Sequence, residues 1–269
     1  MKLKIALAAL ALALPANAHA HRAWILPSST VLSGDAAWVT VDAAVSNDLF
    51  YLNHRPLRIE EMVVTKPDGT KGEYKNAATG ELRSTFDVRL DQAGTWKIGA
   101  ARKGVFGSYK LNGEDKRLPR GASADNLSTL IPAGATDVKI TQSFSRNEVF
   151  ITLGAPNDTV LKPAGEGLEL VPVTHPNDLV AGEGAVLRFV IDGKPAEGVE
   201  LTVIPGGIRY RDAVNEITAK TDAKGEVKIT WPEAGMYWLE AEARDTNAKI
   251  PGATERRLGY VATLEVLTP

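Results

Sequence analysis

The sequence predicts an all-β protein built from two tandem antiparallel β-sandwich domains. Residues 38–43, 86–90 and 227–231 alternate apolar and polar side chains, which is the period of half-buried strands. Turn signals recur between such segments, and the 24 glycines and 15 prolines are spread along the whole chain. No segment has the periodicity of an amphipathic helix beyond a single turn near residues 122–130. Together these observations indicate many short strands joined by tight turns.

Residues 1–20 have the layout of a cleaved signal peptide. Lys2 and Lys4 form a basic start, residues 5–14 are an unbroken apolar run, and Pro15 precedes a small-residue cleavage box. The apolar run is shorter than the roughly 20 residues that a membrane-spanning helix needs. We therefore expect an exported protein that is periplasmic, with secretion as the alternative, and that does not insert directly into a membrane after processing. The chain has no cysteine, which excludes a lipid-anchored cysteine, disulfides and thiolate metal sites.

The rest of the chain is long enough for two domains, and a weak internal repeat supports that division. Residues 93–100 (AGTWKIGA) resemble residues 234–241 (AGMYWLEA), and each follows a strand, a Pro/Gly turn and a hairpin. Two tandem Ig-like domains produce such a repeat. We expect an N-terminal Ig-like sandwich over residues 21–160 and a second sandwich over residues 161–269. The boundary is placed at the Pro/Gly-rich stretch 161–167.

Two features within these domains lead to further expectations. Residues 104–145 fit neither sandwich pattern and are interpreted as a long surface excursion from the first domain. The five tryptophans all fall within strand patterns, so we expect them in the core rather than on an exposed platform for sugars. These tryptophans are Trp24, Trp38, Trp96, Trp231 and Trp238.

Charge and motif content exclude several classes of function. The formal net charge is −2, and removing Lys2 and Lys4 makes it −4. No cluster of lysine and arginine stands out along the sequence, so nucleic acid is not an expected partner. Nucleophile elbows, phosphate-binding loops and zinc-protease motifs are missing from the sequence. We accordingly predict no catalytic residue and a protein that is not an enzyme.

The histidines are the informative residues, because two of the four flank the predicted cleavage site. The small residues at 18 and 20 permit a cut after Ala20, which leaves His21 first. The small residues at 16 and 18 equally permit a cut after Ala18, which leaves His19 first. Either cut gives a mature chain that begins with histidine.

An N-terminal histidine can chelate a metal ion through two nitrogen atoms. Its α-amine has a pKa near 8 and its imidazole a pKa near 6.5, so a metal displaces protons from both around neutral pH. One further imidazole from the folded chain would complete a three-nitrogen histidine brace, which suits Cu(II) or Ni(II) better than Mg or Ca. With His19 first, the amine, two amide nitrogens and His21 would instead form a square-planar site. The expected cofactor is a divalent transition metal, Cu, Ni or Co.

The second imidazole is expected from His54, which follows the first strong strand of the same domain. Asp48 lies nearby in sequence and is a candidate either for binding the metal directly or for orienting a ligand. His175 is a weaker candidate, because it belongs to the second domain and precedes a proline. The candidate metal residues are thus His21, His54, Asp48, His19 and His175.

Several segments resemble known families. Residues 189–203 with 221–229 are similar to prealbumin-like or Cna-B-like sandwiches, which are structural or adaptor modules. Residues 21–28 (HRAWILPS), 47–50 (NDLF), 118–121 (LPRG) and 168–174 (LELVPVT) resemble an exported family of unknown function. That family is usually described as a nickel uptake transporter family protein, or as the periplasmic component of cobalt–nickel transport. The resemblance implies two β domains and a mature chain that starts with histidine.

These considerations predict a periplasmic protein that binds Ni, Co or Cu through an N-terminal histidine site. It would deliver the metal to or from an uptake system, with an outer-membrane receptor or an inner-membrane transporter as partner. Two alternatives stay open at this point. One is a structural or adaptor protein of the envelope without a ligand, and the other is a copper oxidative enzyme acting on polysaccharide.

Overall fold

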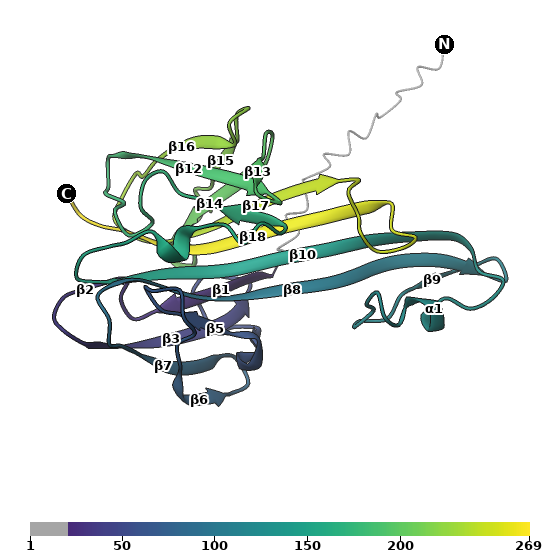
Figure 1. Ribbon diagram of the computed structural model, residues 1–269, viewed down its shortest axis with the longest axis horizontal. Helices are drawn as coiled ribbons and strands as arrows, with labels where there is room; N and C mark the ends of the chain where they lie inside the picture. Colours follow the sequence, from purple (N-terminus) through teal and green to yellow (C-terminus); the bar gives the residue numbers. More distant parts are fainter. Residues whose placement is uncertain (1–20) are drawn as a thin grey trace, which may run out of the picture.

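The computed structural model describes residues 21–269, in which nearly all regular structure is β (Figure 1). The helical pieces are short: η1 (Ile59–Glu61), α1 (Leu127–Leu130), η2 (Thr159–Leu161) and η3 (Ile208–Tyr210). No helix in this part of the chain has the length and apolar character needed to cross a membrane. The strands are β1 (Arg22–Pro27), β2 (Val31–Leu32), β3 (Ala37–Ser46), β4 (Arg55–Pro56), β5 (Val63–Thr65), β6 (Lys75–Thr79), β7 (Ser84–Leu90), β8 (Gly94–Leu111), β9 (Glu114–Arg117), β10 (Thr136–Leu153), β11 (Leu168–Leu170), β12 (Gly184–Ile191), β13 (Lys194–Pro195), β14 (Glu200–Pro205), β15 (Ile217–Lys220), β16 (Glu226–Thr230), β17 (Gly235–Asp245) and β18 (Glu255–Val266). The predicted all-β sandwich class is confirmed.

The first sandwich consists of a small sheet packed on part of a large one. Strands β1, β3, β7 and β6 form the small sheet in that order, and β4 also pairs with β3. Alternate residues of β3 and β7, such as Val39, Phe86 and Val88, are buried against Trp96 and Ile98 of β8. This alternation is what the sequence patterns at 38–43 and 86–90 indicate, because successive side chains of a strand point to opposite faces.

The second sandwich repeats this arrangement with later strands. A four-stranded sheet of β11, β12, β13 and β16 lies over β14, β17 and β18. Its core contains Phe189 of the small sheet, Trp231 immediately after β16, and Tyr237 and Tyr260 of the large sheet, all with no exposed surface. The phenol of Tyr237 donates a hydrogen bond to the Glu233 carbonyl at 2.8 Å, so its polar end is satisfied.

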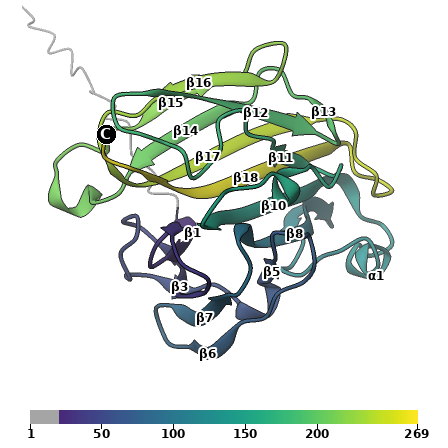
Figure 2. The ribbon, with the colours of Figure 1, turned by 60° about the vertical axis from the view of Figure 1, so that its left-hand side comes forward.

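One nine-stranded sheet runs through both sandwiches, and Figure 2 shows it between the two small sheets. Its order is β15, β14, β17, β18, β10, β8 and β5, with β2 and β9 attached to β10 and β8. The sandwiches join where β10 pairs in parallel with β18, from Thr141 opposite Glu255 to Val149 opposite Thr263. This joint is a continuous ladder of backbone hydrogen bonds between residues before and after position 161. The sequence pattern gave no indication of it.

A small apolar cluster near the start of β1 also connects the two sandwiches. Trp24 and Leu49 from the first sandwich pack with Ile204 and Trp238 from the second. The indole of Trp238 donates a hydrogen bond to the carbonyl of Ala23 at 3.0 Å. The start of β1 is therefore held by residues that come more than two hundred positions later in the sequence.

The internal repeat corresponds to two equivalent turns. Gly94 begins β8 and Gly235 begins β17, with backbone φ angles of 127° and 141° that favour glycine. Two residues further on, Trp96 and Tyr237 enter the first and second cores, respectively. The Ala-Gly signal thus marks the same structural position in each sandwich.

The segment 104–145, expected as a surface excursion, extends the large sheet. Its two ends are the outer parts of β8 and β10, which pair from Lys110 opposite Thr136 inward. Between them lie β9 and the single-turn helix α1, close to the helical turn expected at 122–130. Figure 1 shows this long hairpin reaching beyond both sandwiches.

One expectation about the tryptophans is wrong. Trp24, Trp96, Trp231 and Trp238 are buried, but Trp38 is 53% exposed. In β3 the neighbour Val39 points into the core, and the alternation of the strand turns Trp38 outward. A strand pattern identifies alternation, but not which of its two faces is buried.

Burial of Glu240 on β17 leads to a prediction about stability. Partial burial and the nearby Glu242 carboxylate raise the pKa of Glu240 to about 6, despite opposing effects of Arg22 and Arg257. A raised carboxyl pKa means that ionisation destabilises the folded state above about pH 6, and this penalty is absent below pH 4.5. Glu240→Gln should raise the free energy of unfolding at pH 7 by at most about 2 kcal/mol. Urea unfolding at pH 7 and pH 4.5 checks this, and an equal effect at both pH values would contradict it.

Candidate functional site

The two histidines of interest lie at one end of β3, just before the two strands that flank it there. Arg22 of β1 is opposite Ser46, while Arg55 of β4 is opposite Val45 across the other edge of β3. His21 and His54 are the residues immediately before β1 and β4. Both therefore reach the same end of β3 from opposite sides. Adjacent strands are about 4.8 Å apart, so side chains from the two outer strands can meet across the central one.

The imidazole rings of His21 and His54 stack directly on each other. Their centroids are 3.8 Å apart and their planes are inclined by 27°. Both side chains are exposed, so they can rotate without displacing packed neighbours. Desolvation lowers the pKa of His54, and the positive charges of His21 and Arg55 lower it further. A neutral His54 imidazole has a lone pair available for a metal ion.

The loop that carries His54 is fixed by a chain of hydrogen bonds from the core. The buried indole of Trp24 donates to Ser46 Oγ at 2.7 Å, and that hydroxyl donates to the Asp48 carbonyl at 2.6 Å. Asn53 accepts a hydrogen bond from the Asn47 backbone at 2.9 Å. Leu49 of the same loop is buried in the apolar cluster at the joint. His54 therefore projects from a loop that is anchored at both ends.

Asp48 supports this loop rather than facing the imidazoles directly. Its Oδ2 accepts a hydrogen bond from the Asn53 side chain at 2.9 Å. Its carbonyl accepts hydrogen bonds from Ser46 and from the Tyr51 backbone. Because Asn53 immediately precedes His54, Asp48 positions that histidine through its neighbour. Of the two roles considered for Asp48, this geometry corresponds to the indirect one.

His175 lies elsewhere, where the second sandwich begins. Its Nε2 is 3.0 Å from the Thr95 hydroxyl, and its Nδ1 accepts a hydrogen bond from the Asn177 backbone at 3.2 Å. Burial lowers the pKa of His175, although the charges of Asp158 and Asp178 act in the opposite direction. With both ring nitrogens engaged, this side chain joins segments around residues 95 and 175, and the structure does not bring it to His21.

The remaining candidate, His19, falls outside the described residues. Within residues 21–269, no three histidine, aspartate or glutamate side chains are grouped so that they could hold a metal ion. The donors that the structure brings together are the two imidazoles of His21 and His54. The backbone nitrogen of His21 belongs to one of these two residues. Such a nitrogen becomes a good metal ligand only when it is a free amine.

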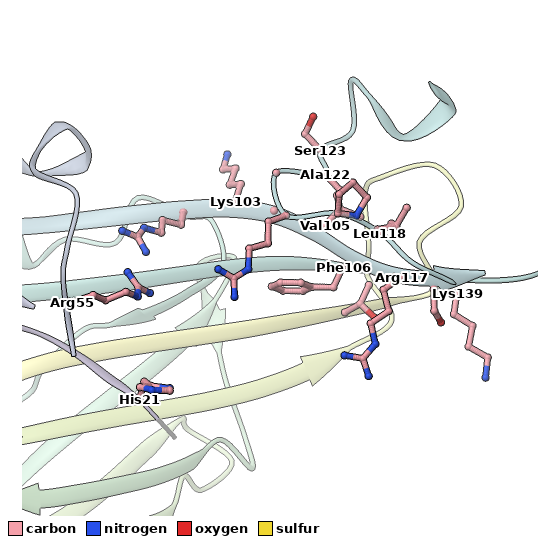
Figure 3. Close-up of a pocket in the computed structure, with 18 of the residues that line it drawn as sticks. His21, Arg55, Lys103, Val105, Phe106, Arg117, Leu118, Ala122, Ser123 and Lys139 are labelled. Atoms are coloured by element: carbon pink, nitrogen blue, oxygen red, sulfur yellow. The ribbon is translucent and has the colours of Figure 1, made fainter. Parts of the chain in front are cut away.

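Beside the histidines opens a groove of about 1270 Å³ that sequence reasoning missed (Figure 3). One wall is formed by His21, His54 and Arg55, and the other by residues 102–108 of β8 and residues 117–123. The segment 117–123 is held against β8 by backbone hydrogen bonds from Leu118 to Gly107 and from Val105 to Ala122. The basic side chains that line the groove come from separate segments of the chain, so the sequence shows no cluster of lysine and arginine.

The profile of one protein family matches residues 18–245, which is well over half of the chain. Its description is "Domain of unknown function (DUF4198)". The chain belongs to this family. The DUF4198 match covers both histidines, the groove and most of the second sandwich. No curated protein matches the sequence.

The solved structures that match this chain have low identity to it and low TM-scores. A trypsin-activated α-2-macroglobulin from Escherichia coli is 12% identical over 91% of this chain, with a TM-score of 0.24, and this chain spans 16% of it. The D0-D1 domain of Intimin is 13% identical over 91% of this chain and 97% of its own, with a TM-score of 0.22. The two tandem V-type regions of the chitin-binding protein VCBP3 are 8% identical over 89% and 98%, with a TM-score of 0.21. At such TM-scores, these likenesses carry no argument about function.

Proposed function

We propose that this protein binds a divalent transition metal, Cu(II) or Ni(II), at a mature N-terminus formed by His21. The observation that carries the proposal is the stacking of His21 and His54 with ring centroids 3.8 Å apart. Two imidazoles on adjacent exposed positions can turn toward one ion without disturbing the core. Cleavage after Ala20 would add the α-amine of His21 as a third nitrogen donor.

The donor set suits late first-row metals. Three nitrogen donors without an accompanying carboxylate favour Cu(II) or Ni(II), with Co(II) binding more weakly in the usual order of affinities. The lowered pKa of His54 reduces competition from protons at neutral pH. The loop anchored by Trp24 and Asp48 holds His54 in place before any metal arrives, which limits the entropy lost on binding.

A carrier role fits this site better than catalysis. The metal is then cargo, and the protein is exported to pass it to or from an uptake system, as the resemblance to nickel and cobalt transport components suggests. The exposure of both imidazoles supports transfer, because a partner can reach the ion directly. We infer a periplasmic location from the predicted signal peptide, with an outer-membrane receptor or an inner-membrane transporter as the partner.

The role of the N-terminal amine can be tested by blocking it. Isothermal titration with Cu(II) compares the chain that begins at His21 with the same chain carrying a Gly-Pro extension. The extension makes His21 the third residue, and the proline nitrogen has no hydrogen to lose, so the extended chain cannot bind Cu(II) through a free amine, two ionised amides and the His21 imidazole. We expect the extended chain to bind Cu(II) at least roughly tenfold more weakly, because one nitrogen ligand is lost.

The control for this comparison is the folded state of both chains, checked by their thermal unfolding in the presence of a chelator. Equal Cu(II) affinities in two equally stable chains would overturn the brace. If neither chain binds Cu(II) or Ni(II), the adaptor role without a ligand becomes the better description.

A further inference from the structure

The groove beside the histidines has a charge that a metal site alone does not explain. Besides the two histidines, the residues lining it include six arginine and lysine side chains and no acidic one. This is a local excess of positive charge in a protein whose formal net charge is −2. The six are Arg55, Arg102, Lys103, Arg117, Arg120 and Lys139. A cleft lined by one sign of charge concentrates ligands of the opposite sign.

Only part of this charge is neutralised by the protein itself. Arg102 pairs with Glu61, and Lys103 pairs with Glu166 at 2.6 Å. Arg55, Arg117, Arg120 and Lys139 form no ion pair with any residue between 21 and 269. Asp137 lies near Lys139 but is paired with Lys110 at 2.8 Å. The guanidinium groups of Arg117 and Arg120 are therefore available to an anion, and guanidinium is the group best suited to carboxylates.

The groove also offers apolar surface and more space than an ion needs. Phe106 is 60% exposed, and its side chain lies on the same side of the hairpin as Arg117 and His21 (Figure 3). Phe106 supplies the exposed apolar surface, because Val105 and Leu118, which also line the groove, pack in a cluster with Ala122 and Ile140. A cavity of about 1270 Å³ is larger than the roughly 300–1000 Å³ of common sites for organic ligands, so it has room for such a ligand. Apolar and cationic groups together match an organic anion better than an inorganic one.

We propose that the groove binds a small organic polycarboxylate, and that this anion is the form in which the metal reaches the histidines. The carboxylates would lie against Arg117 and Arg120, with Arg55 completing the positive wall near His54. His21 and His54 would take up coordination positions of the metal that the chelator leaves open. This inference rests on the proposed metal site and names the kind of complex that the site receives.

The anion half of the proposal can be tested without any metal. Tricarballylate, a tricarboxylate, is titrated calorimetrically into the metal-free chain that begins at His21, in low salt. We expect binding that weakens at least tenfold in the Arg117→Gln/Arg120→Gln variant and falls as added salt screens the charges. The matched control, Arg89→Gln/Lys162→Gln, removes the same charge from exposed positions outside the groove and should bind like the unchanged protein.

The second arm uses the metal with its chelator. Ni(II)–citrate should bind the unchanged protein more tightly than Ni(II) alone, and the arginine variant should lose that advantage while keeping its affinity for Ni(II) alone. Equal tricarballylate binding by all three proteins, or inorganic phosphate binding as tightly as tricarballylate, would overturn the polycarboxylate proposal. Failure of Ni(II) and Cu(II) to bind alone would instead count against the histidine site, so the two ideas fail separately.

Discussion

In the chain that begins at His21, His54→Ala is expected to weaken Cu(II) binding by more than about 100-fold. Loss of groups that merely orient a ligand already costs 10- to 100-fold in metal affinity, and His54 is proposed as a ligand itself. The side chain is exposed and stacks on the equally exposed His21, so its removal should leave the fold unchanged. Calorimetric titration of the unchanged and variant chains measures the effect.

The matched control is His175→Ala, which removes the same ring from a place remote from His21. Because His175 interacts with Thr95 and Asn177, its loss should lower stability slightly and leave the Cu(II) affinity unchanged. A chain that begins at His19 adds a second comparison. There the ion can be held by the amine, two amides and His21, so His54→Ala should have little effect. Equal Cu(II) affinities of the unchanged and His54→Ala proteins in the His21 chain would show that the stacked rings do not share an ion.

Trp24→Ala is expected to lower the free energy of unfolding by about 3–5 kcal/mol. The indole is 1% exposed and packs with Leu49, Ile204 and Trp238 between the two sandwiches. Its removal leaves a cavity there and also leaves the Ser46 hydroxyl without its indole donor. Urea unfolding followed by circular dichroism measures the loss, with Trp38→Ala as the matched control. Trp38 is 53% exposed, so that change should cost less than about 1 kcal/mol.

Trp24→Ala should also disturb the proposed metal site, although Trp24 does not belong to it. Trp24 holds Ser46, and Ser46 holds the carbonyl of Asp48 in the loop that carries His54. A folded Trp24→Ala protein should therefore bind Cu(II) more weakly than the Trp38→Ala protein. Equal free energies of unfolding for the Trp24→Ala and Trp38→Ala proteins would show that packing of Trp24 between the two sandwiches does not stabilise the fold.

The class of fold could be predicted from the sequence because it depends on local patterns. Alternation at 38–43 and 227–231 corresponds to β3 and β16, and the Ala-Gly turns correspond to the starts of β8 and β17. The shared sheet could not be predicted in this way. The parallel pairing of β10 with β18 depends on complementary edges far apart in the chain, and neither strand carries a local signal of its partner.

The candidate site was likewise predictable only in part from the sequence. The importance of His21 and His54 follows from cleavage chemistry and residue type, but their contact depends on β1 and β4 both pairing with β3. The groove was missed because Arg55, Arg117 and Lys139 are each unremarkable where they stand in the sequence. They line one cavity only because the β8–β10 hairpin and the segment after β9 return toward the N-terminus.

The joint between the sandwiches has a consequence for the order of folding. Tyr260 and Glu148 meet across it at a separation of 112 residues, and Trp238 reaches Ala23 at a separation of 215. Contacts between such distant residues form slowly, because a long loop must close first. The contacts that hold β1 in place are thus completed only after β17 and β18 have packed against the first sandwich. The support of the proposed metal site at His21 and His54 would therefore be incomplete until the last strands of the chain had folded.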